Sequence, residues 1–208
     1  MIRSVSVLHV LAPARYGGLE TVVTSLTPAL AGLGHRVSVA LVVTPEEDPH
    51  PHPVAVALEG SAVEVMTLVL RGRDYPGEAR GVKAILQDRS IEVLHTHGYR
   101  PDVLDARVAR RIGIPTVSTV HGFTGGGFKN RAFERLQLRA LRRFDAVAAV
   151  SEPLAERLTD SGVPRDRSPP SAECLDATGS WKGPGRGTGG VGTPADGSRR
   201  RVDRKNES

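Results

Sequence analysis

Short runs of β-branched and aliphatic residues alternate with segments of helical periodicity along most of the chain. Six runs have the length and composition of buried strands. They are residues 5–11, 37–43, 63–70, 91–96, 116–120 and 146–150. Because these runs are almost continuously apolar and do not alternate with polar residues, they predict a parallel sheet that is covered on both faces.

The segments between the runs predict helices. Apolar residues spaced three and four apart from Leu19 to Leu33 define a first helix, which is expected to end near Gly34 in a glycine cap. Further helices are expected over residues 74–87, 102–111, 128–143 and 153–159. This alternation predicts the α/β class: a doubly wound, Rossmann-like parallel sheet, with ligands beyond the carboxyl ends of the strands.

The end of the chain has a different composition. Residues 168–208 contain eight glycines and four prolines, with few large apolar side chains. Such a segment buries too little surface to offset roughly 1–2 kcal/mol of backbone entropy per residue. We therefore expect one folded domain over residues 1–167 and a disordered Gly/Pro/Arg-rich tail over residues 168–208.

Charge and cysteine content narrow the class of protein. The formal net charge of the 208 residues is +5, which is too small for a nucleic-acid-binding surface, so no nucleic-acid partner is expected. The single cysteine, Cys174, excludes an internal disulfide and fits a cytoplasmic location. No Gly-x-Gly-x-x-Gly opens the first helix, which argues against a dinucleotide-dependent dehydrogenase, and no P-loop motif is present, which argues against a P-loop nucleotidase.

The first strand leads into Gly17-Gly18-Leu19-Glu20, where the first helix begins. Paired glycines allow the backbone to approach a ligand closely, and the free N–H groups of a helix start attract anions such as phosphate. The same sequence is also typical of a tight turn without a ligand.

Histidines gather at two neighbouring strand ends. His95 and His97 end the fourth strand, and His121 ends the fifth. One interpretation is a zinc site in which these three imidazoles are ligands, which would suit a zinc hydrolase. A second has His97 and His121 facing a shared cleft, where neutral imidazole binds hydroxyl or phosphate groups. A third leaves them as structural histidines.

The order of the motifs resembles the amino-terminal domain of family-four glycosyltransferases of the GT-B fold. The motifs are Val7-Leu8-His9-Val10-Leu11, Gly17-Gly18-Leu19-Glu20, Gly34-His35-Arg36-Val37, His95-Thr96-His97-Gly98, Thr119-Val120-His121-Gly122 and Val150-Ser151-Glu152. In that family two Rossmann-like domains face each other, and the amino-terminal one holds the acceptor. The resemblance implies a retaining transfer of a sugar from a nucleotide-sugar to a hydroxyl acceptor, either a sugar or a lipid-linked group, with no metal or other cofactor.

The resemblance also implies roles for particular residues. His121 would be the catalytic residue, near the transferred sugar. The expected substrate- or phosphate-binding residues are Gly17, Gly18, Glu20, His97, Tyr99, Arg100, Gly122 and Ser151. The Ser151 hydroxyl has the alternative of an N-cap for the last helix.

The sequence departs from the family after residue 167, where the tail stands in place of a donor-binding domain. We expect a truncated chain, for instance from a frameshift, that is inactive by itself because the groups that stabilise the transition state are missing. The alternative is a non-catalytic module that binds sugar, phosphate or a membrane.

A basic stripe marks the helix expected over residues 128–143. At 100° per residue, one side carries Arg131, Arg135, Arg139 and Arg142. The opposite side carries Phe133, Leu136, Ala140 and Phe144, which are expected to pack on the sheet. The basic side is either a solvated face or a weak contact with an anionic membrane, which would place the protein peripherally at the inner membrane face.

Overall fold

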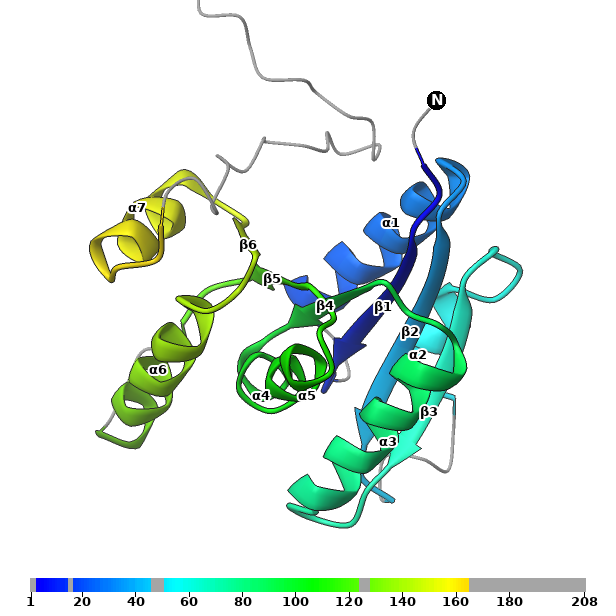
Figure 1. Cartoon of the computed structure of the whole chain (residues 1–208), viewed down its shortest axis with the longest axis horizontal. Helices are drawn as coiled ribbons and strands as arrows, with labels where there is room; N and C mark the ends of the chain where they lie inside the picture. Colours follow the sequence, from blue (N-terminus) through cyan, green and yellow to red (C-terminus); the bar gives the residue numbers. More distant parts are fainter. Residues whose placement is uncertain (1–2, 15–16, 46–50, 124–127, 165–208) are drawn as a thin grey trace, which may run out of the picture.

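The apolar runs form one fully parallel sheet of six strands. The computed structural model describes residues 3–14, 17–45, 51–123 and 128–164. The strands are β1 (Ser6–Leu11), β2 (Arg36–Val43), β3 (Glu64–Val69), β4 (Val93–His97), β5 (Thr116–Val120) and β6 (Ala146–Ala149). They lie in the order β3-β2-β1-β4-β5-β6 (Figure 1). All six predicted strands are confirmed, and so is the doubly wound, Rossmann-like architecture.

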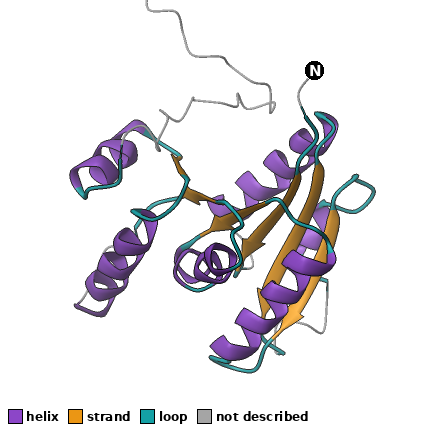
Figure 2. Cartoon of the chain, in the orientation of Figure 1, coloured by secondary structure: helices purple, strands orange, loops and turns teal. Residues whose placement is uncertain are grey.

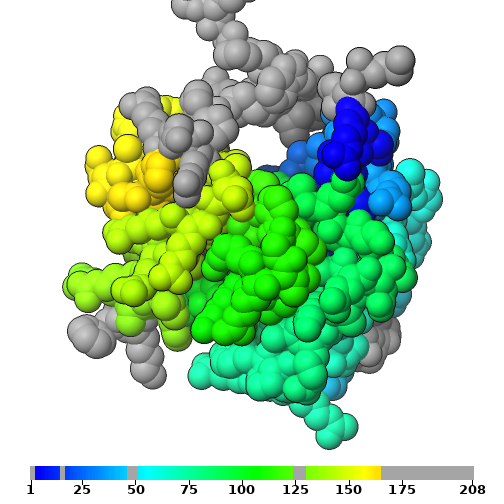
Figure 3. All heavy atoms as spheres, viewed as in Figure 1, coloured from blue at the N-terminus to red at the C-terminus, as the bar shows by residue number. Residues whose placement is uncertain are grey.

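Helices cover the sheet on both faces (Figure 2). They are α1 (Gly18–Gly32), α2 (Pro53–Ala57), α3 (Tyr75–Asp88), α4 (Tyr99–Val103), α5 (Asp105–Arg111), α6 (Phe128–Leu141) and α7 (Glu152–Asp160). Side chains of α1 and α2 pack on one face, with Val39 and Leu41 of β2. Side chains of α3 and α5 pack on the other, with Leu8 and Val10 of β1. Figure 3 shows the second face as a continuous surface that runs from α3 to α6.

The helix predictions hold, with two differences. The segment expected as one helix over residues 102–111 divides at Leu104 into α4 and α5. The five-residue helix α2 was not predicted, because its sequence is rich in proline and too short for a periodic pattern. The expected glycine cap of α1 is confirmed, since Gly34 has φ +89° and its N–H donates to the carbonyl of Ala31.

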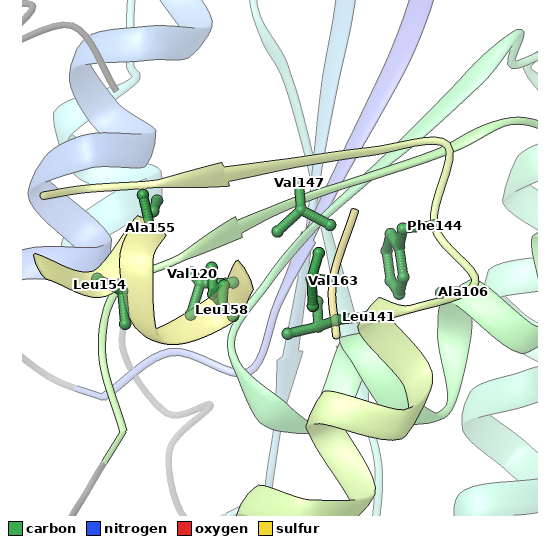
Figure 4. Close-up of a cluster of buried hydrophobic side chains, with 10 residues drawn as sticks. Ala106, Val120, Leu141, Phe144, Val147, Leu154, Ala155, Leu158 and Val163 are labelled. Atoms are coloured by element: carbon green, nitrogen blue, oxygen red, sulfur yellow. The ribbon is translucent and has the colours of Figure 1, made fainter. Parts of the chain in front are cut away.

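A third apolar cluster joins β5, β6, α6 and α7 (Figure 4). Leu141 and Phe144 lie in this cluster with no exposed surface. Phe133 and Leu136, which were expected to pack on the sheet, are instead 47% and 46% exposed, whereas the neighbouring Gln137 is buried. That prediction was wrong because the amide of Gln137 is bound by a buried carboxylate, described below, which fixes the rotation of α6.

The tail predicted over residues 168–208, and with it Cys174, lies outside the described residues.

Candidate functional site

A cavity opens beyond the carboxyl ends of β4 and β5, where the fold predicts a ligand site. Its volume is about 270 Å³. Its walls are formed by Leu19, Gly98, Tyr99, His121, Gly122, Phe123, Asn130, Phe133, Glu134 and Gln137. The structure thus brings three of the predicted site residues, Tyr99, His121 and Gly122, into one pocket.

Two glycines shape the floor of this cavity. Gly98 has φ +90° and Gly122 has φ +133°, a region of conformation that side chains rarely adopt. A Cβ on Gly98 would also lie 3.2 Å from Cδ1 of Leu19. Two aromatic rings form part of the wall, those of Tyr99 and Phe133. They contact each other, with ring centroids 5.1 Å apart. The exposed Phe133 ring is thus part of the cavity wall.

Three histidines form a hydrogen-bonded chain that ends at the cavity. His9 is paired with His95 across β1 and β4, and residues two apart on a strand face the same side, so His97 shares this face. His9 Nδ1 lies 2.9 Å from His97 Nε2. His97 Nδ1 in turn lies 3.3 Å from Nε2 of His121, which lines the cavity.

The expectation that His97 faces the cleft beside His121 is corrected by this arrangement. His97 is 1% exposed and does not line the cavity, because it lies within β4 on a covered face. His121 comes after the last residue of β5 and is only half-buried. His97 therefore contacts a residue of the cavity wall, His121, without lining the cavity itself.

The histidines are held in the neutral state. Burial lowers the pKa of His9 and His97 well below the ordinary value, and the neighbouring imidazoles lower it further. Burial lowers the pKa of His95 to about 3 and that of His121 to about 4. The carboxylate of Glu20 opposes the shift at His121. All four imidazoles are consequently neutral near pH 7, each with one donor and one acceptor nitrogen.

The zinc interpretation had His95, His97 and His121 as ligands. Among the described residues, the histidines that could hold a metal ion are instead His9, His95 and His97, because one ring nitrogen from each lies within 4.8 Å of those of the other two. His95 Nε2 is hydrogen-bonded to Thr119 Oγ1 at 2.8 Å. The ring centroids of His95 and His97 are 4.5 Å apart, with 19° between the ring planes.

Glu20 anchors the loop between β1 and α1. Its Oε1 accepts a hydrogen bond from the N–H of Ala14 at 2.8 Å, and its side chain is buried. The carbonyl of Ala14 is bonded to Nε2 of His52 at 3.1 Å, while Nδ1 of His52 accepts from the N–H of Val54 and caps α2. The negative charge at the start of α1 therefore comes from the protein itself.

The two glycines at the start of α1 differ in their surroundings. A Cβ on Gly17 would lie 2.6 Å from Glu20 Oε2, whereas a Cβ on Gly18 would meet nothing within 4 Å. Close packing at Gly17 thus serves the Glu20 carboxylate. Phosphate binding by this pair remains a prediction.

Arg100 and Ser151 are placed away from the cavity walls. The Arg100 guanidinium forms a salt bridge of 2.6 Å with the fully buried Glu78 of α3 and stacks over Tyr75. Ser151 is exposed at the start of α7, and its hydroxyl makes no capping hydrogen bond, contrary to the N-cap expected there. A ligand-binding role for either residue stays a prediction.

A buried carboxylate, that of Asp102, joins the elements around the cavity by hydrogen bonds. Asp102 has no exposed surface and accepts hydrogen bonds from Thr96 Oγ1 at 2.6 Å, Ser118 Oγ at 2.8 Å and Gln137 Nε2 at 2.7 Å. Burial raises the pKa of Asp102 to about 6, against the effect of these three donors. One residue of α4 thereby holds β4, β5 and α6 together.

The basic stripe is on the surface, as expected, although its members differ. Arg131, Arg135 and Arg139 are exposed, and the apolar Leu136 is exposed beside them. Arg142 donates from Nε and from its terminal nitrogen to the carbonyl of Ser161, at 3.0 and 2.6 Å, and so binds the end of α7. None of the described helices is long and apolar enough to cross a membrane.

Several residues of this site carried no sequence signal. His9 lies within an apolar strand, and its connection to His121 depends on strand register. Asp102 and Gln137 are polar residues in helices, a position that normally indicates solvent exposure. The first turn of α1 did contain a signal for Glu20, whereas its bond to Ala14 depends on a loop conformation.

Several solved structures share this fold. A glycosyltransferase from Rickettsia africae ESF-5 is 14% identical, with a TM-score of 0.61, over 80% of this chain and 42% of its own. Anabaena Alr3699/HepE in complex with UDP is 15% identical, with a TM-score of 0.59, over 80% and 43%. The UDP-GlcNAc 2-epimerase from Neisseria meningitidis bound to UDP-GlcNAc is 12% identical, with a TM-score of 0.55, over 80% and 46%.

The chain thus spans less than half the length of these structures. The comparison with curated proteins finds no match. The model of Glycosyltransferase Family 4 matches residues 16–168, about three quarters of the sequence, a region that includes the cavity and most of the sheet. On this match, the chain belongs to Glycosyltransferase Family 4.

Proposed function

We propose that this chain forms the acceptor-binding side of a retaining glycosyltransferase, which moves a sugar from a nucleotide-sugar donor to a hydroxyl group without a metal ion. The observation that carries the proposal is the position of His121: a neutral imidazole on the wall of a cavity at the strand ends of a Family 4 domain. A neutral imidazole binds a hydroxyl as donor or acceptor without requiring a charge on the ligand.

The composition of the cavity suits a sugar ring. Tyr99, Phe123 and Phe133 provide flat apolar walls, while His121 and Gln137 provide polar groups that can orient hydroxyls. The volume of about 270 Å³ is just below the range of roughly 300–1,000 Å³ for drug-sized ligands. We infer that the cavity takes one sugar unit, and that the nucleotide lies outside it.

The donor half of the reaction is assigned by analogy. HepE is described in complex with UDP, with UDP-glucose, and with UDP and glucose, and the Neisseria epimerase with UDP-GlcNAc. We therefore propose a nucleotide-sugar as co-substrate. Because the matched structures are more than twice as long as their overlap with this chain, we propose that donor-binding groups lie outside residues 16–168 and that turnover requires them.

Isotope-edited NMR of the full chain tests this function. Glucose, N-acetylglucosamine, UDP and UDP-glucose would be titrated separately, with the amides of Gly98, His121 and Gly122 as reporters. We expect saturable shifts confined to the cavity with at least one sugar, and their loss in His121→Ala. The matched control is His35→Ala, which removes a histidine at the opposite, amino-terminal end of the strands. Shifts that persist in His121→Ala, or no shift with any sugar, would contradict the proposal.

A second candidate is a peripheral module that binds an anionic membrane at the cytoplasmic face, alone or together with transfer to a lipid-linked acceptor. It is favoured by one observation: the exposed Leu136 lies among Arg135 and Arg139 of α6 and Arg142, which directly follows that helix. An apolar side chain surrounded by arginines combines insertion with charge attraction. Vesicle binding, described in the Discussion, tests this candidate.

A further inference from the structure

The hydrogen bonds that join His9, His97 and His121 run from donor to acceptor in one direction. That direction follows from the surroundings of His9, at the buried end of the chain. Among the described residues, His9 Nε2 is fully buried and has no hydrogen-bond partner. The other nitrogen of His9, Nδ1, contacts His97 Nε2 at 2.9 Å. The proton of neutral His9 can therefore lie on the unpaired nitrogen or in the hydrogen bond to His97.

These two arrangements differ in what is left unpaired. If the proton were on Nε2, an N–H donor would be buried without an acceptor, which native structures rarely tolerate. If the proton is on Nδ1, only a lone pair is left unpaired, and His9 donates to His97. Burial of His9 thus favours the tautomer with its proton on Nδ1.

The remaining protons follow from this first choice. A His97 ring that accepts at Nε2 is protonated at Nδ1 when neutral, and it donates to His121 Nε2 at 3.3 Å. His121 then accepts at Nε2 and carries its own proton on Nδ1. Burial and neighbouring imidazoles keep the pKa of His97 well below its ordinary value, so that the ring does not gain a second proton near pH 7.

We infer that His9 and His97 are positioning residues that hold His121 in the tautomer with its proton on Nδ1, so that His121 presents an N–H donor to the ligand in the cavity. This inference rests on the proposed function only for the identity of that ligand. A ligand hydroxyl would accept a hydrogen bond from His121 Nδ1.

Nitrogen spectroscopy of the ligand-free full chain tests the tautomer directly. Long-range proton–nitrogen correlation distinguishes the protonated from the unprotonated ring nitrogen of each histidine. We expect His9, His97 and His121 each to show a protonated Nδ1 and an unprotonated Nε2 near neutral pH. A protonated Nε2 on His121 in the native chain would overturn the inference without reference to any ligand.

Two substitutions of His97 provide a loss and a rescue. In His97→Leu the donor to His121 is removed, and the two nitrogen resonances of His121 should exchange identities as the proton moves to Nε2. In His97→Asn the amide nitrogen can take the place of Nδ1, and the native pattern at His121 should return. A His121 pattern that is native in both variants would overturn the inference. If His97→Leu does not fold, the native chain and His97→Asn still decide the question.

A matched control and a metal addition complete the test. His95→Gln removes another imidazole from the same stack, outside the hydrogen-bonded chain, and should leave the His121 tautomer unchanged. A changed tautomer in this variant would show that general packing sets it. One equivalent of zinc should leave the nitrogen spectra of the native chain and of the three variants unchanged. Zinc-dependent shifts of His9, His95 and His97 would identify a metal site and overturn the inference that these histidines position His121. A native tautomer pattern with no sugar binding would instead reject the proposed function alone.

Discussion

Glu20 Oε1 accepts a hydrogen bond of 2.8 Å from the backbone N–H of Ala14, across the loop that joins β1 to α1. The carbonyl of the same Ala14 is bonded to His52. The loop is therefore held through both backbone polar groups of one residue, the N–H and the carbonyl of Ala14. Gly17 lies against the other carboxylate oxygen of Glu20, which makes the adjacent pair of glycines a natural comparison.

Gly17→Ala should weaken sugar binding, whereas Gly18→Ala should not. The new Cβ at position 17 would lie 2.6 Å from Glu20 Oε2 and would displace the carboxylate from Ala14, at a cost of about 1 kcal/mol for the lost hydrogen bond. At position 18 alanine has open space and a helical conformation, so stability should rise by up to about 1 kcal/mol. Urea denaturation and sugar titration of both variants provide the measurement. Equal effects of the two substitutions would contradict this account.

Acidification should destabilise the fold through its buried histidines. An imidazole whose folded pKa lies below 6.5 takes up its proton more readily in the unfolded chain, so the stability that it contributes is present above pH 6.5 and is lost as pH falls toward the folded pKa. His95, with a pKa of about 3, and His9 and His97 each cost about 1.4 kcal/mol per pH unit in this window. His121 contributes in the same way, although Glu20 raises its pKa and so reduces the pH dependence that it adds.

Three carboxyls act in the opposite direction. Burial raises the pKa of Asp102 to about 6, that of Asp105 well above its ordinary value, and that of Glu78 above its ordinary value, so protonation of each stabilises the fold as pH falls. The four imidazoles outweigh the three carboxyls, and we expect the free energy of unfolding to fall between about pH 6.5 and pH 4.5. Urea denaturation at several pH values would show this slope. A free energy that is constant or rises over this window would show that the histidines are already protonated in the fold.

Asp105→Asn should stabilise the protein at neutral pH. Asp105 has no exposed surface, and among the described residues neither of its carboxylate oxygens has a hydrogen-bond partner. Removing the charge should raise the free energy of unfolding by at least about 1 kcal/mol near pH 7, with a smaller gain at lower pH, where the carboxyl is already neutral. The exposed Asp88→Asn is the control and should change little. Destabilisation by Asp105→Asn would mean that the carboxylate is stabilised by its surroundings.

Vesicle binding should depend on the three arginines of α6, Arg131, Arg135 and Arg139. Arg131/Arg135/Arg139→Ala should weaken co-sedimentation with anionic vesicles by about a hundredfold, from roughly 1 kcal/mol per arginine near the surface. Arg71/Arg73/Arg80→Ala removes the same charge from other exposed positions and should have a smaller effect. Arg142→Ala should instead lower stability, because its guanidinium binds the carbonyl of Ser161. Unchanged binding in the α6 variant would reject the membrane contact.

The strands were predictable because their signal is local. A parallel sheet buried on both faces requires nearly continuous apolar runs, and β2 has seven buried residues out of eight. The rotation of α6 was not predictable in the same way. A helical wheel places Phe133 and Leu136 inward, whereas the hydrogen bond from Gln137 to Asp102 turns an amide to that side. The partner of Gln137 is 35 residues away in the sequence.

The site was partly predictable because the strand ends were predictable. His121, Tyr99 and Gly122 follow strand ends, which the order of elements brings to one edge of the sheet. His9 and His97 were more difficult, because their roles depend on the register of β1 against β4 and on which face α1 covers. A sequence pattern identifies the edge at which side chains meet, whereas the contact of one ring with the next is a tertiary property.

The bracing by Asp102 has a consequence for selectivity. Gln137 is both a wall of the cavity and one of three donors to this buried carboxylate, so α6 cannot move outward without breaking a charge-assisted hydrogen bond in the interior. A ligand with an extra substituent gains no room from the helix. The pocket should therefore discriminate among epimers and substituted rings by rigid exclusion, and it should lose little conformational entropy when the right one binds.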